Sequence, residues 1–191
     1  ISSPSVDALL MNRLELPRHL KRVPIFGLGC VAGAAGVARA ADYVKAFPDQ
    51  VAAVVSVELC SLTLQREDLS TANLISSGLF GDGCGVALVA GEKTGAEGPR
   101  ILATRSVFYS HSEHVMGWKV SEKGFTIVLS PEVPEMVRTH LAEDTDSFLA
   151  DHGLARNDIG NWILHTGGPH VLSATEEALG LTNGELEASW S

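Results

Sequence analysis

Positive charge is scarce in this sequence. Its 191 residues include 14 Lys and Arg against 23 Asp and Glu, which gives a formal net charge of −9. Because proteins that bind nucleic acid usually carry a basic excess, we expect no nucleic acid among the partners. Long apolar runs are missing too, since none approaches the roughly 20 residues of a membrane-spanning helix. We therefore expect no membrane span.

Cysteine is also rare. Cys30, Cys60 and Cys84 are an odd number without paired spacing, which argues against a disulfide framework and favours buried or catalytic thiols in a reducing cytoplasm. No signal peptide opens the sequence, which neither begins with Met nor closes on a capped helix or strand. We expect a cytoplasmic protein, and a fragment of a longer polypeptide that lacks both ends.

Strand patterns and helix patterns alternate along the chain. Strands are expected at 23–26, 51–59, 84–91, 101–109, 125–129 and 161–164, and helices from the turn at Cys30 to Phe47 and over 73–79, 131–152 and 170–179. This alternation predicts an α/β fold around a mixed or parallel sheet. The β-branched run at 51–59 is typical of a parallel strand buried on both faces.

The stretch at 25–40, IFGLGCVAGAAGVARA, carries a cysteine at the tip of a glycine-rich turn. The small residues that follow predict a helix whose backbone packs very close to another element. A sulfur at a helix N-terminus meets unpaired N–H groups and the positive end of the dipole, which favour the thiolate. We therefore interpret Cys30 as a nucleophile.

Two other interpretations of the same turn stay open. Gly27, Gly29 and Ala32 fit a loose dinucleotide-binding fingerprint, in which Glu58 would hold a ribose. Glu58 lies later than the usual spacing of about 20 residues, however, and a cysteine is not needed to cradle a pyrophosphate. Cys30 could also be a buried small apolar residue, as most cysteines are.

A thiolate nucleophile needs a base or a cation as its partner. Of seven histidines, His165 stands out because it ends an apolar segment and precedes the turn 166–169, a place where α/β proteins put functional side chains. A core histidine bonded to backbone is the alternative. His170 is a second candidate that caps the helix or lines an entrance, whereas His111 and His114 are two ligands without a third, so no metal is expected.

The turn Phe80–Gly83 brings an aromatic ring close to backbone, where it is either functional or an ordinary core phenylalanine. With this turn, three motifs stand in order: GLGCVAGAAG, LFGDG and HTGGP. Together they resemble the type III polyketide synthases, the chalcone synthase family on the thiolase fold. The segments ISSPSVD, VELCSLT and MGWKVSEKGFTIVLS align as well, so the resemblance runs essentially from end to end.

The resemblance implies a thiolase-like layered α-β-α fold with duplicated halves, incomplete in this chain. Residues 1–93 would be the C-terminal portion of the first half and carry Cys30, and residues 98–191 most of the second half and carry His165. The family completes its triad with an asparagine in a downstream GN-x-S-type turn. No such motif occurs here, so that asparagine is expected beyond residue 191.

The implied reaction is a decarboxylative Claisen condensation of an acyl-CoA starter with malonyl-CoA. Cys30 would carry the acyl chain, His165 would be the catalytic histidine, Phe80 a gatekeeper and His170 a coenzyme contact at the entrance. No cofactor would be permanently bound, and the family implies a homodimer. Thr166 replaces the proline usual in this motif, and Ala8 replaces a methionine that crosses the dimer interface in plant relatives.

Departures from the plant enzymes bear on the substrate. By alignment, Ile127 replaces the second gatekeeper phenylalanine. Further positions that would line the cavity are Ser3, Cys60, Thr63 and Gly117. Cys60 in VELCSLT resembles bacterial members that accept fatty acyl starters and make alkylpyrones or alkylresorcinols. The alternatives are a condensing enzyme like ketoacyl-acyl-carrier-protein synthase III, a non-catalytic dinucleotide-binding module, and a piece that serves only folding or dimerisation.

Overall fold

The computed structural model describes residues 5–122, 124–182 and 184–190, whose chain forms two compact units. Unit 1 holds the chain up to Glu58 and again Gly83–Thr104, and unit 2 holds Leu59–Asp82 and the chain from Arg105 onward. Each unit is described by itself below. These units are not the two halves predicted at 1–93 and 98–191. Those halves are inferred from an internal duplication of the fold, and they stay a prediction.

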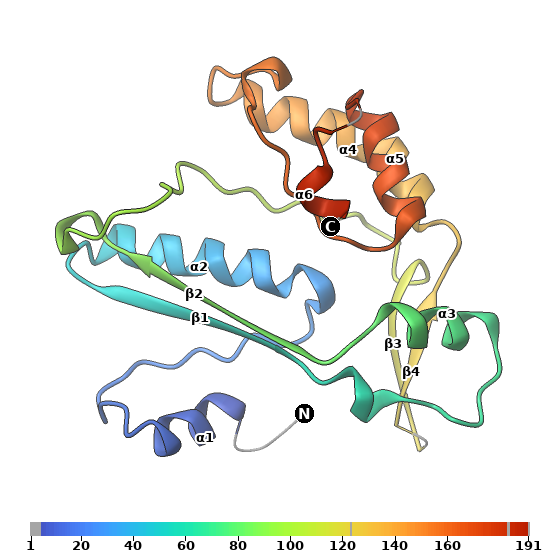
Figure 1. Ribbon diagram of the computed structural model, residues 1–191, viewed down its shortest axis with the longest axis horizontal. Coiled ribbons are helices and arrows are strands. Elements are labelled where there is room, and N and C mark those ends of the chain that lie inside the picture. The colour runs from blue at the N-terminus through green and yellow to red at the C-terminus, as the bar shows by residue number, and fades with distance from the viewer. Residues whose placement is uncertain (1–4, 123, 183, 191) are drawn as a thin grey trace. The chain divides into compact units, whose positions relative to one another are not determined.

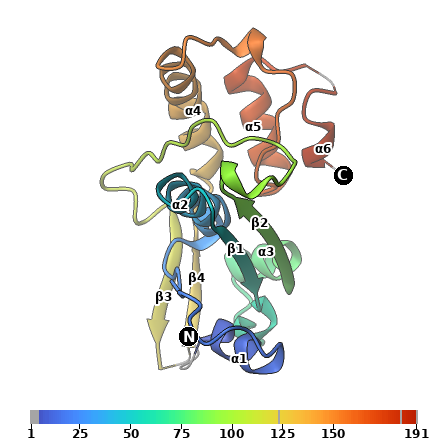
Figure 2. The ribbon, with the colours of Figure 1, turned by 90° about the vertical axis from the view of Figure 1, so that its left-hand side faces the viewer.

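Unit 1 is a two-stranded ribbon with a helix along it (Figures 1 and 2). Its elements are α1 (Val6–Arg13), η1 (Gly29–Val31), α2 (Ala32–Ala46), β1 (Val51–Glu58), β2 (Gly83–Ala90) and η3 (Glu92–Thr94). A Cβ atom at Gly36 of α2 would lie only 3.1 Å from Cγ1 of Val54 in β1. The predicted close approach of the helix backbone to another element is therefore confirmed, and β1 is that element.

The direction predicted for β1 is wrong. β1 pairs antiparallel with β2, from Val51 opposite Ala90 to Glu58 opposite Gly83. The chain leaves β1 at Glu58 and, after residues 59–82, enters β2 at Gly83, which lies opposite Glu58. The two strands are therefore a hairpin with a long connection. Apolar side chains of both strands, such as Val55 and Leu88, are exposed. A continuous apolar run thus identified the strand but fixed neither its direction nor its burial.

Unit 2 combines a hairpin with packed helices. Its elements are η2 (Cys60–Thr63), α3 (Thr71–Leu79), β3 (Met116–Ser121), β4 (Gly124–Leu129), α4 (Val133–Ala150), η4 (Arg156–Asp158), α5 (Pro169–Leu179) and α6 (Glu187–Trp190). β3 and β4 pair antiparallel, and α4 packs beside α5 (Figures 1 and 2). Leu149 of α4 and Leu172 of α5 are buried.

Three of the expected strands are absent from the described chain: 23–26, 101–109 and 161–164 have no regular structure. Side-chain contacts hold parts of two of them in place of a backbone ladder. Arg105 pairs with Asp151, which directly follows α4, and the Tyr109 hydroxyl donates a hydrogen bond to Asp144. The Leu164 N–H donates to the Ser189 hydroxyl at 2.9 Å. The partner of β4 is β3, which lies between the segments expected as strands at 101–109 and 125–129.

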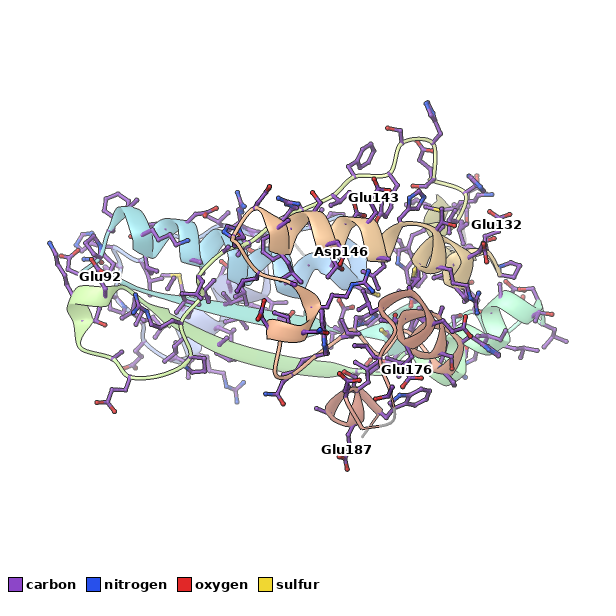
Figure 3. The ribbon with its side chains drawn as sticks, turned by 90° about the horizontal axis from the view of Figure 1, so that it is seen from above. Glu92, Glu132, Glu143, Asp146, Glu176 and Glu187 are labelled. Atoms are coloured by element: carbon purple, nitrogen blue, oxygen red, sulfur yellow. The ribbon has the colours of Figure 1, made fainter. Side chains whose placement is uncertain are left out.

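Negative charge gathers on the helices of unit 2. Figure 3 labels five of these carboxylates. Glu132 directly precedes α4, Glu143 and Asp146 lie on α4, Glu176 on α5 and Glu187 on α6. None of the described helices is long and apolar enough to cross a membrane.

One arginine joins α4 to the end of α5. Nε and Nη2 of Arg156 donate to the two carboxylate oxygens of Asp146 at 2.6 and 2.7 Å, and Nη1 donates to the Leu179 carbonyl at 2.8 Å. The hydrogen bonds to Asp146, together with its negative charge, raise the pKa of the Arg156 guanidinium above its ordinary value. Because such fork-like pairs fix geometry as well as charge, Arg156 sets how α4 and α5 meet.

We expect Arg156→Ala to lower the melting temperature of the protein by about 5 °C, because it removes the pair with Asp146 and leaves the Leu179 carbonyl unpaired. The matched control is Arg39→Ala. Arg39 pairs with Asp42 one turn along α2, and both side chains are well exposed, so its loss should change the melting temperature by about 1 °C or less. Thermal unfolding followed by circular dichroism gives both melting temperatures. An equal decrease in the two variants would contradict the role of Arg156 in joining α4 to α5.

Candidate active site

Cys30 lies at the elbow between an irregular segment and α2. It is the middle residue of η1, which leads directly into α2 at Ala32. Gly27 and Gly29 have φ angles of 88° and 53°, which non-glycine residues rarely adopt. The predicted turn and helix start are confirmed, while the strand expected before them is absent. The elbow leaves the Cys30 side chain exposed.

The surroundings of Cys30 within unit 1 oppose the thiolate. Nearby protein atoms displace water from the sulfur, and this desolvation together with the negative charge of Glu58 raises the pKa of the Cys30 thiol. A backbone hydrogen bond lowers the pKa by less. The backbone at the start of the helix thus favours the thiolate, as expected, but desolvation and Glu58 outweigh it. Activation of Cys30 requires a positively charged partner.

The structural context of a dinucleotide fingerprint is missing in the described chain. That fingerprint needs a strand before the glycines and a parallel strand after the helix. Residues 23–26 form no strand, and β1 after α2 pairs antiparallel with β2. The Glu58 carboxylate acts on the Cys30 thiol instead. These observations do not support the interpretation that Glu58 holds a ribose.

Unit 2 contains a cavity of about 220 Å³. It brings together four of the residues predicted to line the substrate cavity: Cys60, Thr63, Phe80 and Ile127. Ser61, Leu64, Asn73, Ser76, Ser77, Gly81, Asp82, Trp118 and Phe125 complete its lining. Polar residues of η2 and α3 thus line the same cavity as three aromatic residues.

Trp118 is one of the lining residues that the sequence interpretation missed. It lies directly opposite Ile127 in the β3–β4 ladder, and residues opposite each other share one face of a sheet. Its ring centroid is 6.3 Å from that of Phe80 and 6.2 Å from that of Phe125. Gly117 is not among the lining residues, since neighbours along a strand point to opposite faces. Ser3 lies outside the described residues.

His165 precedes α5 in the turn that the sequence singled out. Its carbonyl accepts a hydrogen bond from the Gly167 N–H at 3.0 Å, and its side chain is exposed. A Cβ at Gly168 would lie 3.6 Å from Leu79 of α3, the residue before Phe80. The HTGGP and LFGDG motifs are therefore neighbours within unit 2. Cys30 belongs to unit 1. That its sulfur lies close to a ring nitrogen of His165 therefore stays a prediction.

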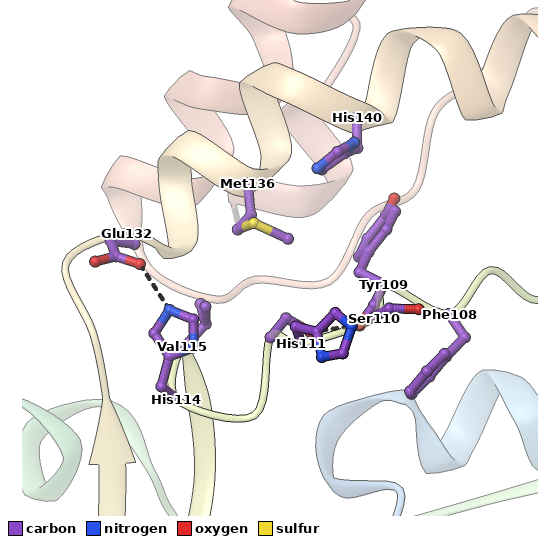
Figure 4. Close-up of a pocket in the computed structure, with 10 residues that line it drawn as sticks. Phe108, Tyr109, Ser110, His111, His114, Val115, Glu132, Met136 and His140 are labelled. Atoms are coloured by element: carbon purple, nitrogen blue, oxygen red, sulfur yellow. Dashed lines mark hydrogen bonds and ion pairs between the residues drawn. The ribbon is translucent and has the colours of Figure 1, made fainter.

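A second cavity of unit 2, of about 330 Å³, lies between α4 and residues 108–115 (Figure 4). His114 faces Glu132 at 3.3 Å, and the His140 ring stacks on Tyr109 with centroids 4.5 Å apart. Burial and the Asp144 carboxylate raise the pKa of Tyr109 to about 12. Within the described ranges, no group of three or more His, Cys, Asp or Glu side chains is placed to hold a metal ion.

Two family models match the chain and together span it. The model described as FAE1/Type III polyketide synthase-like protein matches residues 1–107. The model described as chalcone and stilbene synthases, C-terminal domain, matches residues 100–191.

Curated relatives and solved structures agree with these models. The chain is 49% identical to a 1,3,6,8-tetrahydroxynaphthalene synthase of Streptomyces peucetius subsp. caesius, over 100% of this chain and 51% of that protein. It is 42% identical to a putative chalcone synthase of Bacillus subtilis, over 100% of this chain and 54% of that protein. The crystal structure of 1,3,6,8-tetrahydroxynaphthalene synthase from Streptomyces coelicolor matches with a TM-score of 0.91 at 32% identity, over 97% of this chain and 53% of that one. The chain thus spans about half the length of these relatives.

We expect Glu58→Gln to lower the pKa of the Cys30 thiol, because it removes a negative charge that disfavours the thiolate. The pH midpoint of Cys30 alkylation by iodoacetamide, measured with Cys60 and Cys84 replaced by serine, should move to lower pH. Glu92→Gln is the matched control, since Glu92 follows the end of β2 that lies opposite Val51, at the far end of the ribbon from Glu58. An unchanged midpoint in Glu58→Gln would contradict the electrostatic account.

Proposed function

The chain belongs to the type III polyketide synthase family, and we propose on this premise that it condenses an acyl-CoA starter with malonyl-CoA by decarboxylative Claisen chemistry. Its fold is the thiolase-like α/β fold of that family, present over about half the length of the relatives. The observation that carries the proposal is the ordered set of motifs around Cys30, Phe80 and His165, within a chain that is 49% identical to a tetrahydroxynaphthalene synthase.

Cys30 is the proposed nucleophile, and His165 its proposed activator. The raised pKa of the Cys30 thiol leaves it neutral unless a cation offsets its desolvation and the charge of Glu58. A His165 imidazolium paired with the sulfur supplies that charge. The thiolate attacks the thioester carbonyl of the starter, a new C–S bond forms, and CoA leaves as a thiolate that takes up a proton.

The extension step needs an enolate. Malonyl-CoA loses carbon dioxide, and the electron pair of the broken C–C bond becomes the enolate of acetyl-CoA. A ring N–H of His165 donates to its oxyanion, together with the side-chain amide of the family's downstream asparagine. The enolate carbon attacks the acyl-cysteine, a C–C bond forms, and the Cys30 thiolate is released. Phe80 acts as an apolar lid that excludes water from this step.

We propose two candidate products, which differ in the starter. From Cys60 we propose a fatty acyl starter and an alkylpyrone or alkylresorcinol product, and a relative at 32% identity from Mycobacterium tuberculosis is named for alpha-pyrone synthesis. A tetrahydroxynaphthalene is the second candidate product, because the relative at 49% identity is named for it.

The remaining expectations are proposals as well. They are a homodimer, a cytoplasmic location, no permanently bound cofactor, and a coenzyme contact at His170. His170 is exposed in the first turn of α5, which suits contact with a ligand at an entrance. Ser3 stays a candidate for the cavity by resemblance alone.

We expect Cys30→Ala to reduce polyketide formation by at least about a thousandfold, because no other group replaces the acyl-carrying thiolate. Incubation with radiolabelled malonyl-CoA and a fatty acyl-CoA measures product, and mass spectrometry of the trapped protein locates the acyl group. Cys84→Ala is the matched control, since Cys84 is an exposed thiol of β2, and it should keep wild-type activity.

The same experiment separates the two candidate products. A product that retains the alkyl chain supports the fatty acyl starter, and a tetrahydroxynaphthalene supports the second candidate. No acyl group on Cys30, together with unchanged product from Cys30→Ala, would overturn the proposed function.

A further inference from the structure

We infer that Asp82 is a positioning residue that joins the two facing walls of the unit 2 cavity and thereby sets the length of the polyketide made there. The inference rests on the proposed function, in which this cavity receives the growing chain. Asp82 is part of the LFGDG motif, two residues after Phe80. Neither the mechanism above nor the predicted cavity lining gives it a role.

The contact is a two-point hydrogen bond between carboxylate and turn. Oδ1 of Asp82 accepts from the Ser61 N–H at 2.7 Å, and Oδ2 accepts from the Ser61 hydroxyl at 2.6 Å. Bonds from one residue to both oxygens of a carboxylate fix orientation as well as distance, as in other bidentate pairs. The Ser61 hydroxyl and then the Ser61 N–H lower the pKa of Asp82 below its ordinary value, so the carboxylate is ionised at neutral pH.

Ser61 lies inside the wall formed by η2. Its neighbour Cys60 lines the cavity, as does Thr63 two residues further on. The Thr63 hydroxyl donates to the Cys60 carbonyl at 2.9 Å, so this short turn is held in shape internally. A movement of Ser61 therefore moves the whole wall.

The other end of the contact belongs to the wall that carries Phe80. Phe80 follows α3 and lies beside Trp118. Because Asp82 is two residues away, the bond to Ser61 places the Cys60–Thr63 wall at a fixed distance from the Phe80 ring. The space between these walls limits how far an acyl chain can extend before it cyclises or is released.

Asp82→Ala should broaden the product profile. Without the carboxylate the Cys60–Thr63 wall is free to shift, and the ratio of shorter or longer polyketides to the main product should rise about tenfold. Ser61→Ala removes only the hydroxyl bond and should give a smaller change in the same direction. Asp82→Asn keeps an acceptor for the Ser61 N–H and should restore most of the wild-type profile. Mass spectrometry of products, with kcat and KM for malonyl-CoA, gives the readout.

Glu185→Ala is the matched control. Oε2 of Glu185 accepts hydrogen bonds from both the N–H and the hydroxyl of Thr182, three residues earlier, at 2.7 and 3.0 Å, so its carboxylate also binds a hydroxyl residue of the same unit, but outside the cavity lining. We expect a similar loss of thermal stability from both alanine variants and an altered product profile only from Asp82→Ala. Ser61→Ala decides the matter if Asp82→Ala does not fold.

The outcomes distinguish the two proposals. A wild-type protein that forms no polyketide overturns the proposed function and this inference with it. A wild-type protein that forms polyketide, with unchanged profiles from Asp82→Ala and Ser61→Ala, overturns the inference alone. Equal changes in profile from Asp82→Ala and Glu185→Ala also overturn it, because they indicate a loss of stability rather than a displaced wall.

Discussion

The reaction proposed for this chain depends on whether the sulfur atom of Cys30 carries a negative charge. A cysteine attacks a thioester as a thiolate, and the surroundings of Cys30 in unit 1 raise the pKa of its thiol through desolvation and the carboxylate of Glu58. A glycine-rich elbow at the start of α2 exposes the sulfur but does not charge it. The nucleophile proposed for this family member therefore depends on a positively charged partner that offsets these two effects.

Unit 2 holds the HTGGP motif with the proposed activator His165, together with the cavity that we propose for the growing chain. The HTGGP turn packs against Leu79, so His165 and the Phe80 loop are set by the same contact between α3 and the start of α5. Polar residues of η2 line this cavity together with Phe80, Trp118 and Phe125. Arg156 fixes how α4 meets α5. The proposed nucleophile Cys30 and the walls of this cavity thus belong to separate compact units.

Local chemistry made much of this structure predictable. Glycines mark the elbow at Cys30 because Gly27 and Gly29 take positive φ angles, and α5 begins at a proline and ends at Gly180 as its sequence indicates. Non-local pairing could not be predicted in the same way. The apolar run of β1 does not say that its partner runs antiparallel, and residues 101–109 have the composition of a strand without a backbone partner. Because side chains alternate between the two faces of a strand, an error of one residue along β3 places Gly117 in the cavity wall where the structure has Trp118.

The titration of the Cys30 thiol in wild-type protein and in His165→Gln tests the account most directly. Alkylation rates measured against pH, with Cys60 and Cys84 replaced by serine, report the pKa of the remaining thiol. If the His165 imidazolium stabilises the thiolate, the midpoint of the wild-type profile lies at lower pH than that of His165→Gln. Coincident midpoints would show that His165 does not charge Cys30, and would contradict the central claim.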